Sequence, residues 1–212
     1  MNFRNLAALT LFALPFAAHA SDLLNDNFDS ESPDLNYTGF VNWNVLGGTV
    51  DIHGSGSPWG NGQQKYAADR FVDLDGSNGQ NGVMETKSNL LVSAGQTLAI
   101  SYDLNLNPGS PYNSDNGIRV ELGRGGAFTN VLTHDEFVPN PLGTWRHVEL
   151  MYTATAADAN DGLKMRMSGL GAADWQGVFV DNVRVQSVPE PCSMAALGVG
   201  ALGLLRRRAK RA

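Results

Sequence analysis

The sequence predicts an all-β protein, an antiparallel β-sandwich, and three observations support that fold class. About ten short runs of strand-forming residues recur along 21–187, separated by stretches rich in Gly, Asn, Ser and Pro. The clearest run, 97–107, alternates apolar with polar residues, as a strand does when one face is buried and the other is wet. No long stretch shows helical spacing, so the strands have no helices to connect them into a parallel sheet.

The expected strands follow one another with turn signals between them. Gly47-Gly48 predicts a hairpin between the second and the third strand. Asp181 and Asn182 interrupt the apolar residues of the last run and predict a β-bulge. Residues 154–160 have room for one helical turn. The strands are expected at 25–29, 39–45, 49–53, 70–74, 83–87, 97–107, 118–122, 145–153, 163–168 and 177–185.

The N-terminus has the features of a secretory signal peptide. An almost wholly apolar stretch, 6–18, follows Arg4, and Ala18, His19 and Ala20 fit the small-x-small cleavage pattern. Residues 1–20 are therefore expected to be a signal peptide that is cleaved after Ala20. The alternative is a membrane anchor, but the apolar run is shorter than a membrane span requires.

The C-terminus, 188–212, has three parts in a fixed order. A Pro-Glu-Pro triplet is followed by an apolar segment, 192–205, and a basic tail, 206–212. As a helix, Met194–Leu205 would be about 18 Å long, which is short of the roughly 30 Å hydrocarbon core. The segment is therefore expected to be a short apolar helix that anchors only transiently, with its basic tail on the cytoplasmic side. The alternative is a basic tail that binds nucleic acid.

The region between these ends is expected to be one acidic domain, 21–187. It carries nine basic and twenty acidic residues, a net charge near −11. Such a domain repels nucleic acid and anionic lipid. The single cysteine, Cys192, lies in the C-terminal segment, so no disulfide can form within the domain.

The C-terminal segment closely resembles the PEP-CTERM sorting signal of Gram-negative bacteria that make extracellular polysaccharide. The resemblance rests on Val188, Pro189, Glu190 and Pro191, the apolar run and the arginines after it. In that family the signal is recognised by exosortase, an integral-membrane cysteine transpeptidase, so the chain is the substrate. The resemblance implies export through Sec, transient retention in the inner membrane, processing near Pro-Glu-Pro, and delivery to the cell surface or exopolysaccharide matrix.

The domain is also similar to a family of binding modules. The segments 70–77, 92–104 and 180–185 resemble jelly-roll domains of the galactose-binding-like and carbohydrate-binding type, including the DUF642 group. The resemblance implies a jelly-roll sandwich that binds glycans. Asp29 and Asp181 match positions where such modules often bind a structural Ca²⁺. The alternative is that Asp29 caps a turn and Asp181 marks a bulge.

Four tryptophans are the aromatic candidates for binding. Trp59 and Trp175 lie among Gly, Ser and Asp and are expected to form exposed platforms that stack on a sugar ring. The alternative is that they anchor loops. Trp43 and Trp145 lie in strands and are expected in the core.

Catalysis has little support in the sequence. The domain has neither Gly-x-Ser-x-Gly nor a cysteine nucleophile, and its histidines lack metal-type spacing. The expected function is therefore non-catalytic glycan binding. A structural matrix protein with no specific ligand is the alternative. A carbohydrate-active enzyme, with a pair drawn from Glu85, Glu121, Glu136 and Glu149, is the third possibility.

Overall fold

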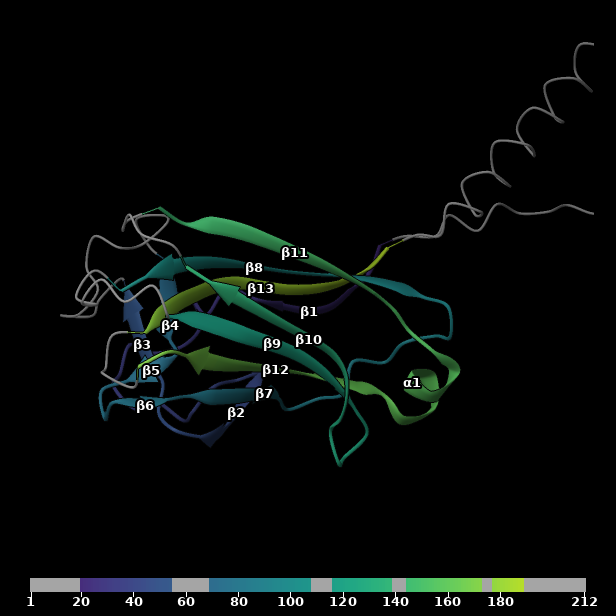
Figure 1. The fold of residues 1–212 in the computed structure, drawn as a ribbon, viewed down its shortest axis with the longest axis horizontal. Helices are drawn as coiled ribbons and strands as arrows, with labels where there is room; N and C mark the ends of the chain where they lie inside the picture. The colour runs from purple at the N-terminus through teal and green to yellow at the C-terminus, as the bar shows by residue number, and fades with distance from the viewer. Residues whose placement is uncertain (1–19, 55–68, 108–115, 139–143, 173–176, 189–212) are drawn as a thin grey trace, which may run out of the picture. The chain divides into compact units, whose positions relative to one another are not determined.

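Two antiparallel sheets pack face to face in the described part of the chain (Figure 1). The structure is a computed structural model, and it describes residues 20–54, 69–107, 116–138, 144–172 and 177–188. Ser21–Val188 form one compact unit. The elements are β1 Asp22–Asp26, β2 Trp43–Gly47, β3 Asp51–Gly54, β4 Arg70–Asp73, β5 Asp75–Gly76, β6 Gln80–Asn81, β7 Val83–Thr86, β8 Thr97–Leu106, β9 Gly117–Arg124, β10 Thr129–Phe137, β11 Arg146–Thr153, α1 Ala156–Asp161, β12 Leu163–Leu170 and β13 Val178–Val188.

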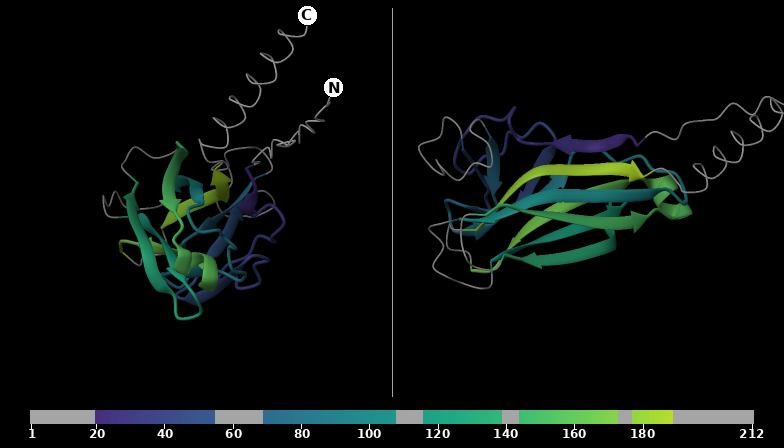
Figure 2. Two further views of the ribbon diagram at one scale, coloured as in Figure 1. Left: turned by 90° about the vertical axis from the view of Figure 1, so that its right-hand side faces the viewer. Right: turned by 90° about the horizontal axis from the view of Figure 1, so that it is seen from above.

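The strand order confirms the predicted antiparallel jelly-roll sandwich. Sheet A has the order β11-β8-β13-β4-β3, with β1 also paired to β13, and sheet B has the order β10-β9-β12-β7-β2. β5 and β6 pair with each other in a third, two-stranded sheet, which bonds the segment between β2 and β3 through Thr49. Seen from above, β1, β13, β8 and β11 lie side by side (Figure 2). The first and last strands of the described unit are therefore neighbours.

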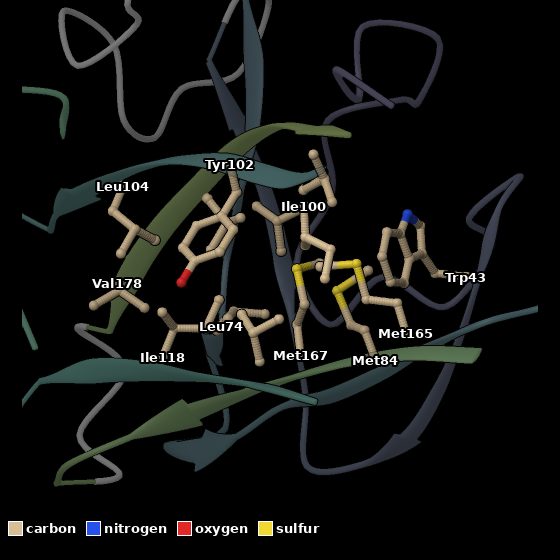
Figure 3. Close-up of a cluster of buried hydrophobic side chains, with 14 of the residues drawn as sticks. Trp43, Leu74, Met84, Ile100, Tyr102, Leu104, Ile118, Met165, Met167 and Val178 are labelled. Atoms are coloured by element: carbon tan, nitrogen blue, oxygen red, sulfur yellow. The ribbon is translucent and has the colours of Figure 1, made fainter. Parts of the chain in front are cut away.

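The core fills the space between the sheets. Ile100, Tyr102 and Leu104 point inward from sheet A towards Met165 and Met167 of sheet B (Figure 3). The alternate residues of β8, such as Asp103, point away from the core, because successive side chains of a strand alternate between its faces. Trp43 is fully buried, as predicted.

A bulge in β13 lets this strand serve two neighbours. Its pairing with β8 shifts register between Asp181 and Arg184, and Asn182 has a left-handed backbone with φ 51°. Before the bulge β13 pairs with β4, and after it β13 pairs with β1. The predicted bulge is confirmed, and so is the short helix α1 within the region expected to hold one turn.

Three local expectations are wrong. Gly47-Gly48 does not close a hairpin, because β2 pairs with β7 in sheet B and β3 with β4 in sheet A. Gly48 instead carries the chain between the sheets at φ +60°, where a Cβ would lie 2.0 Å from the Asn81 carbonyl oxygen. The first strand ends at Asp26, so Phe28 is a buried turn residue. β10 was not expected at all.

The described residues contain no helix long and apolar enough to cross a membrane. The expected signal peptide, apart from Ala20, and the sorting segment after Val188 lie outside the described residues.

Candidate functional site

Polar and aromatic side chains gather on the outer face of sheet A, the face turned away from the core. Two of the strands that carry them, β3 and β4, lie at the end of the sandwich opposite α1 (Figure 1). One row crosses four strands, since Asn105 pairs with Phe179, Phe179 with Asp73, and Asp73 with Asp51. A second row holds His147, Asp103 and Asp181 on β11, β8 and β13. We call these two rows, together with the adjoining side chains of His53, Phe71 and Trp145, the outer patch.

An aromatic cluster lies within the outer patch. The ring centroids of Phe71 and Phe179 are 4.6 Å apart, and Trp145 meets Phe71 edge-on at 5.5 Å. His53 lies 5.7 Å from Phe179. Phe71 and Phe179 are buried, yet they do not belong to the core between the sheets.

Trp145 is therefore not a core residue, which corrects the expectation from its strand-like surroundings. It comes just before β11 and is half-buried at the rim of the outer patch. The residue thus combines an edge-to-face contact with Phe71 and partial exposure to solvent, and partly exposed aromatic rings are suited to stacking on a sugar.

Next to Trp145 a hydrogen-bonded chain runs across three strands. His147 Nδ1 lies 2.8 Å from Asp103 Oδ1, and Asn182 donates to Asp103 Oδ2 at 2.9 Å. Asn182 also donates through its side chain to Asp181 Oδ2 at 3.1 Å and through its backbone to Oδ1 at 2.6 Å. The bulge positions Asn182 for this bridge. The His147 side chain is 58 % exposed, whereas Asp103 behind it is buried.

Asn105 adds a buried polar group to the outer patch. It is 1 % exposed, and its Oδ1 accepts from the Leu106 N–H at 2.9 Å. Among the described residues, its Nδ2 has no hydrogen-bond partner. A buried donor without a partner costs free energy, so its retention favours a functional role.

Two carboxyl groups of the outer patch have raised pKa values. Burial raises the pKa of Asp73 well above its usual range, even though the Asp75 N–H and Asn107 donate to it, and the Asp51 and Asp75 carboxylates add to the rise. Gly177 leaves room for this group, since a Cβ there would lie 2.8 Å from Asp73 Oδ1.

Burial likewise raises the pKa of Asp181 to about 8. The Asn182 N–H opposes the rise, while the Asp69, Asp29 and Asp103 carboxylates contribute to it. Carboxyls held neutral by burial are concentrated at functional sites in proteins.

The outer face of sheet B is different, because its charges neutralise one another. Glu85 accepts from Arg166 at 2.7 Å and from Lys164 at 3.1 Å, and Arg119 pairs with Asp135 at 2.7 Å. Phe128 lies over Gly123, with the Arg166 guanidinium 3.7 Å from its ring centroid. These side chains satisfy each other, so this face offers fewer free groups to a ligand.

The predicted calcium ligands lie near each other but are already engaged. The Asp29 carboxylate raises the pKa of Asp181, so the two groups are within electrostatic reach. Asp29 accepts from the Arg70 N–H at 2.9 Å and from Asn27 at 2.7 Å, while Asp181 accepts from Asn182. Within the described ranges no three His, Cys, Asp or Glu side chains are arranged to hold a metal ion. The calcium site stays a prediction.

The remaining predicted residues lie outside the described residues: Trp59, Trp175, Ala18, Pro189, Glu190 and Pro191. Ala20 is described and exposed, and Val188 ends β13. Sequence reasoning missed the outer patch. One signal was available, since Asp103 and Asn105 occupy the polar positions of the clearest alternating strand, where a solvated surface was the simpler interpretation.

Comparisons with known proteins concern the C-terminal segment and the fold of the sandwich. Residues 187–211 match the family model described as the PEP-CTERM protein-sorting motif. This match implies export and exosortase sorting to the cell surface or extracellular space. No match is found among curated proteins.

Similar solved structures share the fold at low sequence identity. A cyclase from Fischerella sp. TAU is 14 % identical, with a TM-score of 0.55 over 81 % of this chain and 98 % of the cyclase. The arabinose-bound α-L-arabinofuranosidase MgGH51 is 13 % identical, with a TM-score of 0.55 over 78 % of this chain. The chain spans only 26 % of that enzyme. The xylan-binding CBM22-1 domain of Paenibacillus barcinonensis Xyn10C has a TM-score of 0.44 at 14 % identity, over 81 % of this chain and 97 % of that domain.

Proposed function

We propose that this chain is an exosortase-sorted surface or matrix protein whose β-sandwich binds a glycan without catalysing a reaction on it. The observation that carries the proposal is the rim of the outer patch. There Trp145 is half-buried and His147 is exposed, in front of the buried side chains of Asn105 and Asp103.

The chemistry of this rim suits a sugar. The face of an aromatic ring packs on the apolar C–H face of a pyranose, and neighbouring amide, carboxyl and imidazole groups bond its hydroxyls. Trp145 supplies the ring and His147 supplies an exposed ring nitrogen, since its Nδ1 is already engaged with Asp103.

Binding fits the carboxyl groups better than catalysis does. Asp103 is held by His147 and Asn182, and Asp181 is held by Asn182. A glycosidase needs two facing carboxyls that reach the scissile bond. Those of the outer patch are instead engaged within the protein.

The sorting signal indicates where the sandwich would meet a glycan. A polysaccharide matrix at the cell surface would surround the sandwich with glycans once it is exported. The proposed route is Sec export with removal of residues 1–20, brief retention through 192–205, and processing at Pro189, Glu190 and Pro191.

Retention of the chain lacking residues 1–20 on immobilised exopolysaccharide from the producing cells tests the proposal. Trp145→Ala should reduce retention at least about tenfold, as expected for losing a stacking contact and its ordered neighbours. Phe128→Ala, an aromatic truncation on the outer face of sheet B, is the matched control and should retain like the wild type. Far-UV circular dichroism checks that both variants fold.

Two further variants test the predicted loop platforms, Trp59→Ala and Trp175→Ala. Loss of retention in these variants alone would move the site from the outer patch to the loops. Wild-type protein that is not retained on any glycan would favour a structural matrix protein. Release of reducing ends from the glycan would favour an enzyme.

A further inference from the structure

Two carbonyl groups in the turn that follows β1 bind one cationic side chain of the chain itself, that of Arg70. Phe28 has a left-handed backbone with φ 55°, and its N–H donates to Asp26 Oδ1 at 3.0 Å. The Glu31 N–H closes the turn on the Phe28 carbonyl at 3.0 Å. A left-handed conformation is unfavourable for a residue as large as Phe, so other contacts must hold it.

Phe28 itself is fully buried against Phe40 and Trp43, and Arg70, the first residue of β4, bonds the residues that follow it in the turn. Its Nη1 donates to the Asp29 carbonyl at 2.9 Å and also to the Glu31 carbonyl, while its backbone N–H donates to Asp29 Oδ1 at 2.9 Å. Two main-chain oxygens therefore face one positive group, a geometry that oxygen-binding metal ions also use.

The side-chain carboxylates of the turn are engaged in other directions. The buried Glu31 accepts from the Val41 N–H at 2.6 Å and from the Tyr37 hydroxyl at 3.1 Å. Asp29 accepts from Asn27 at 2.7 Å in addition to Arg70. A Ca²⁺ ion needs six to eight oxygen ligands, so it would have to break several of these bonds and displace the guanidinium.

We propose that the Arg70 guanidinium is the built-in cation of this turn and does the work that the predicted calcium ion would do. It holds the Asp29–Glu31 carbonyls and ties the segment after β1 to β4. The sandwich then keeps its N-terminal strand without a divalent ion.

The test measures melting temperature for the chain lacking residues 1–20, in excess Ca²⁺ and in EDTA. The wild type should melt at the same temperature in both. Arg70→Met, which keeps the apolar stem and removes the cation, should lower the melting temperature by about 5 °C or more. Arg70→Lys, which keeps a cation, should lose less than Arg70→Met.

Arg184→Met is the matched control, because Arg184 also ties the N-terminal strand, through the exposed Asp22 carboxylate at 2.9 and 3.0 Å. An exposed pair of this kind contributes little, so this variant should shift melting by only about 1–2 °C. A wild type that melts higher in Ca²⁺ would overturn the proposal. An Arg70→Met variant no worse than Arg184→Met, or no worse than Arg70→Lys, would overturn it as well.

Discussion

At the scale of single residues, the outer patch depends on carboxyl groups that the fold keeps protonated. Asp181 is 1 % exposed in the bulge of β13, and burial raises its pKa to about 8 from an ordinary value of 3.8. Between these values the folded protein holds a proton that the unfolded chain releases. The stability that Asp181 contributes is therefore fully present below pH 3.8 and is lost as the pH rises through 8.

We expect the melting temperature to fall between pH 5 and pH 8, and Asp181→Asn to remove the part of that fall that Asp181 causes, while Asp73, whose pKa burial also raises, keeps its own share. The amide cannot ionise, so the variant should melt roughly 5–10 °C above the wild type at pH 8 while matching it near pH 5. Differential scanning calorimetry across this range measures both curves.

Asp135→Asn is the control for this experiment. The hydrogen bond from Arg119 lowers the pKa of Asp135, so its contribution is present above the unfolded pKa and is lost only as the pH falls further. The decline between pH 5 and pH 8 should persist in Asp135→Asn. If Asp181→Asn declines as steeply as the wild type, Asp181 is ionised in the fold.

At the scale of elements, α1 is a helix of only six residues, and its N-terminal cap helps to stabilise it. Thr155 and Asp158 form a capping box, and the Thr155 N–H, the Thr155 hydroxyl and the Tyr152 hydroxyl each donate to Asp158 Oδ2 at 2.7 Å. Burial would raise the pKa of Asp158, but these bonds and nearby Arg124 hold it below its ordinary value.

Removing the cap should therefore destabilise the fold, because the exposed Thr155 is bonded to the fully buried Asp158. Thr155→Ala should lower the free energy of unfolding by about 1 kcal/mol. Asp158→Ala should lower it by about 2–3 kcal/mol, because it leaves several donors without an acceptor. Chemical denaturation measures both. The exposed Asp161→Ala, at the end of the same helix, is the control, and equal losses in all three variants would contradict the capping account.

The elements also show what sequence patterns can and cannot predict. β8 was predicted closely, because one of its faces meets the core and its residues alternate accordingly. β10 was missed because it is an edge strand in which no residue is fully buried, so its sequence carries no clear alternation. Gly47-Gly48 was misread because local turn chemistry does not reveal which sheet receives the next strand.

The outer patch was hard to predict for a related reason. Its residues come from β3, β4, β8, β11 and β13, and only the sheet order brings them together. Trp145 in particular looks like a core residue, since its strand-like neighbours do not reveal which face its ring occupies. The bulge at Asp181 and Asn182 was visible in the sequence, but the bridge that Asn182 makes to Asp103 was not.

At the scale of the whole molecule, charge is distributed unequally between the two outer faces. Sheet B sets Glu85 and Asp135 against Arg166 and Arg119, and these charges pair. On sheet A the outward carboxylates of Asp51, Asp103 and Glu149 face few cations among the described residues, and Arg184 is already paired with Asp22. Burial keeps Asp73 and Asp181 on the same face protonated, so they add little charge. The domain as a whole carries twenty acidic and nine basic residues. The proposed binding face is therefore the more acidic one.

This asymmetry predicts which glycans the sandwich accepts. At low ionic strength an anionic polysaccharide should be repelled, so a uronate polymer should be retained at least several-fold less than a neutral glucan. Added salt shortens the Debye length from about 10 Å at 0.1 M to about 3 Å at 1 M, so it screens the repulsion between the domain and the uronate. Added NaCl should therefore reduce the difference in retention between the two polymers, mainly because the uronate is retained more strongly. Affinity electrophoresis over a salt series measures both polymers. Stronger retention of the uronate at low salt would place binding on the charge-paired face of sheet B, where Phe128→Ala rather than Trp145→Ala should then abolish it.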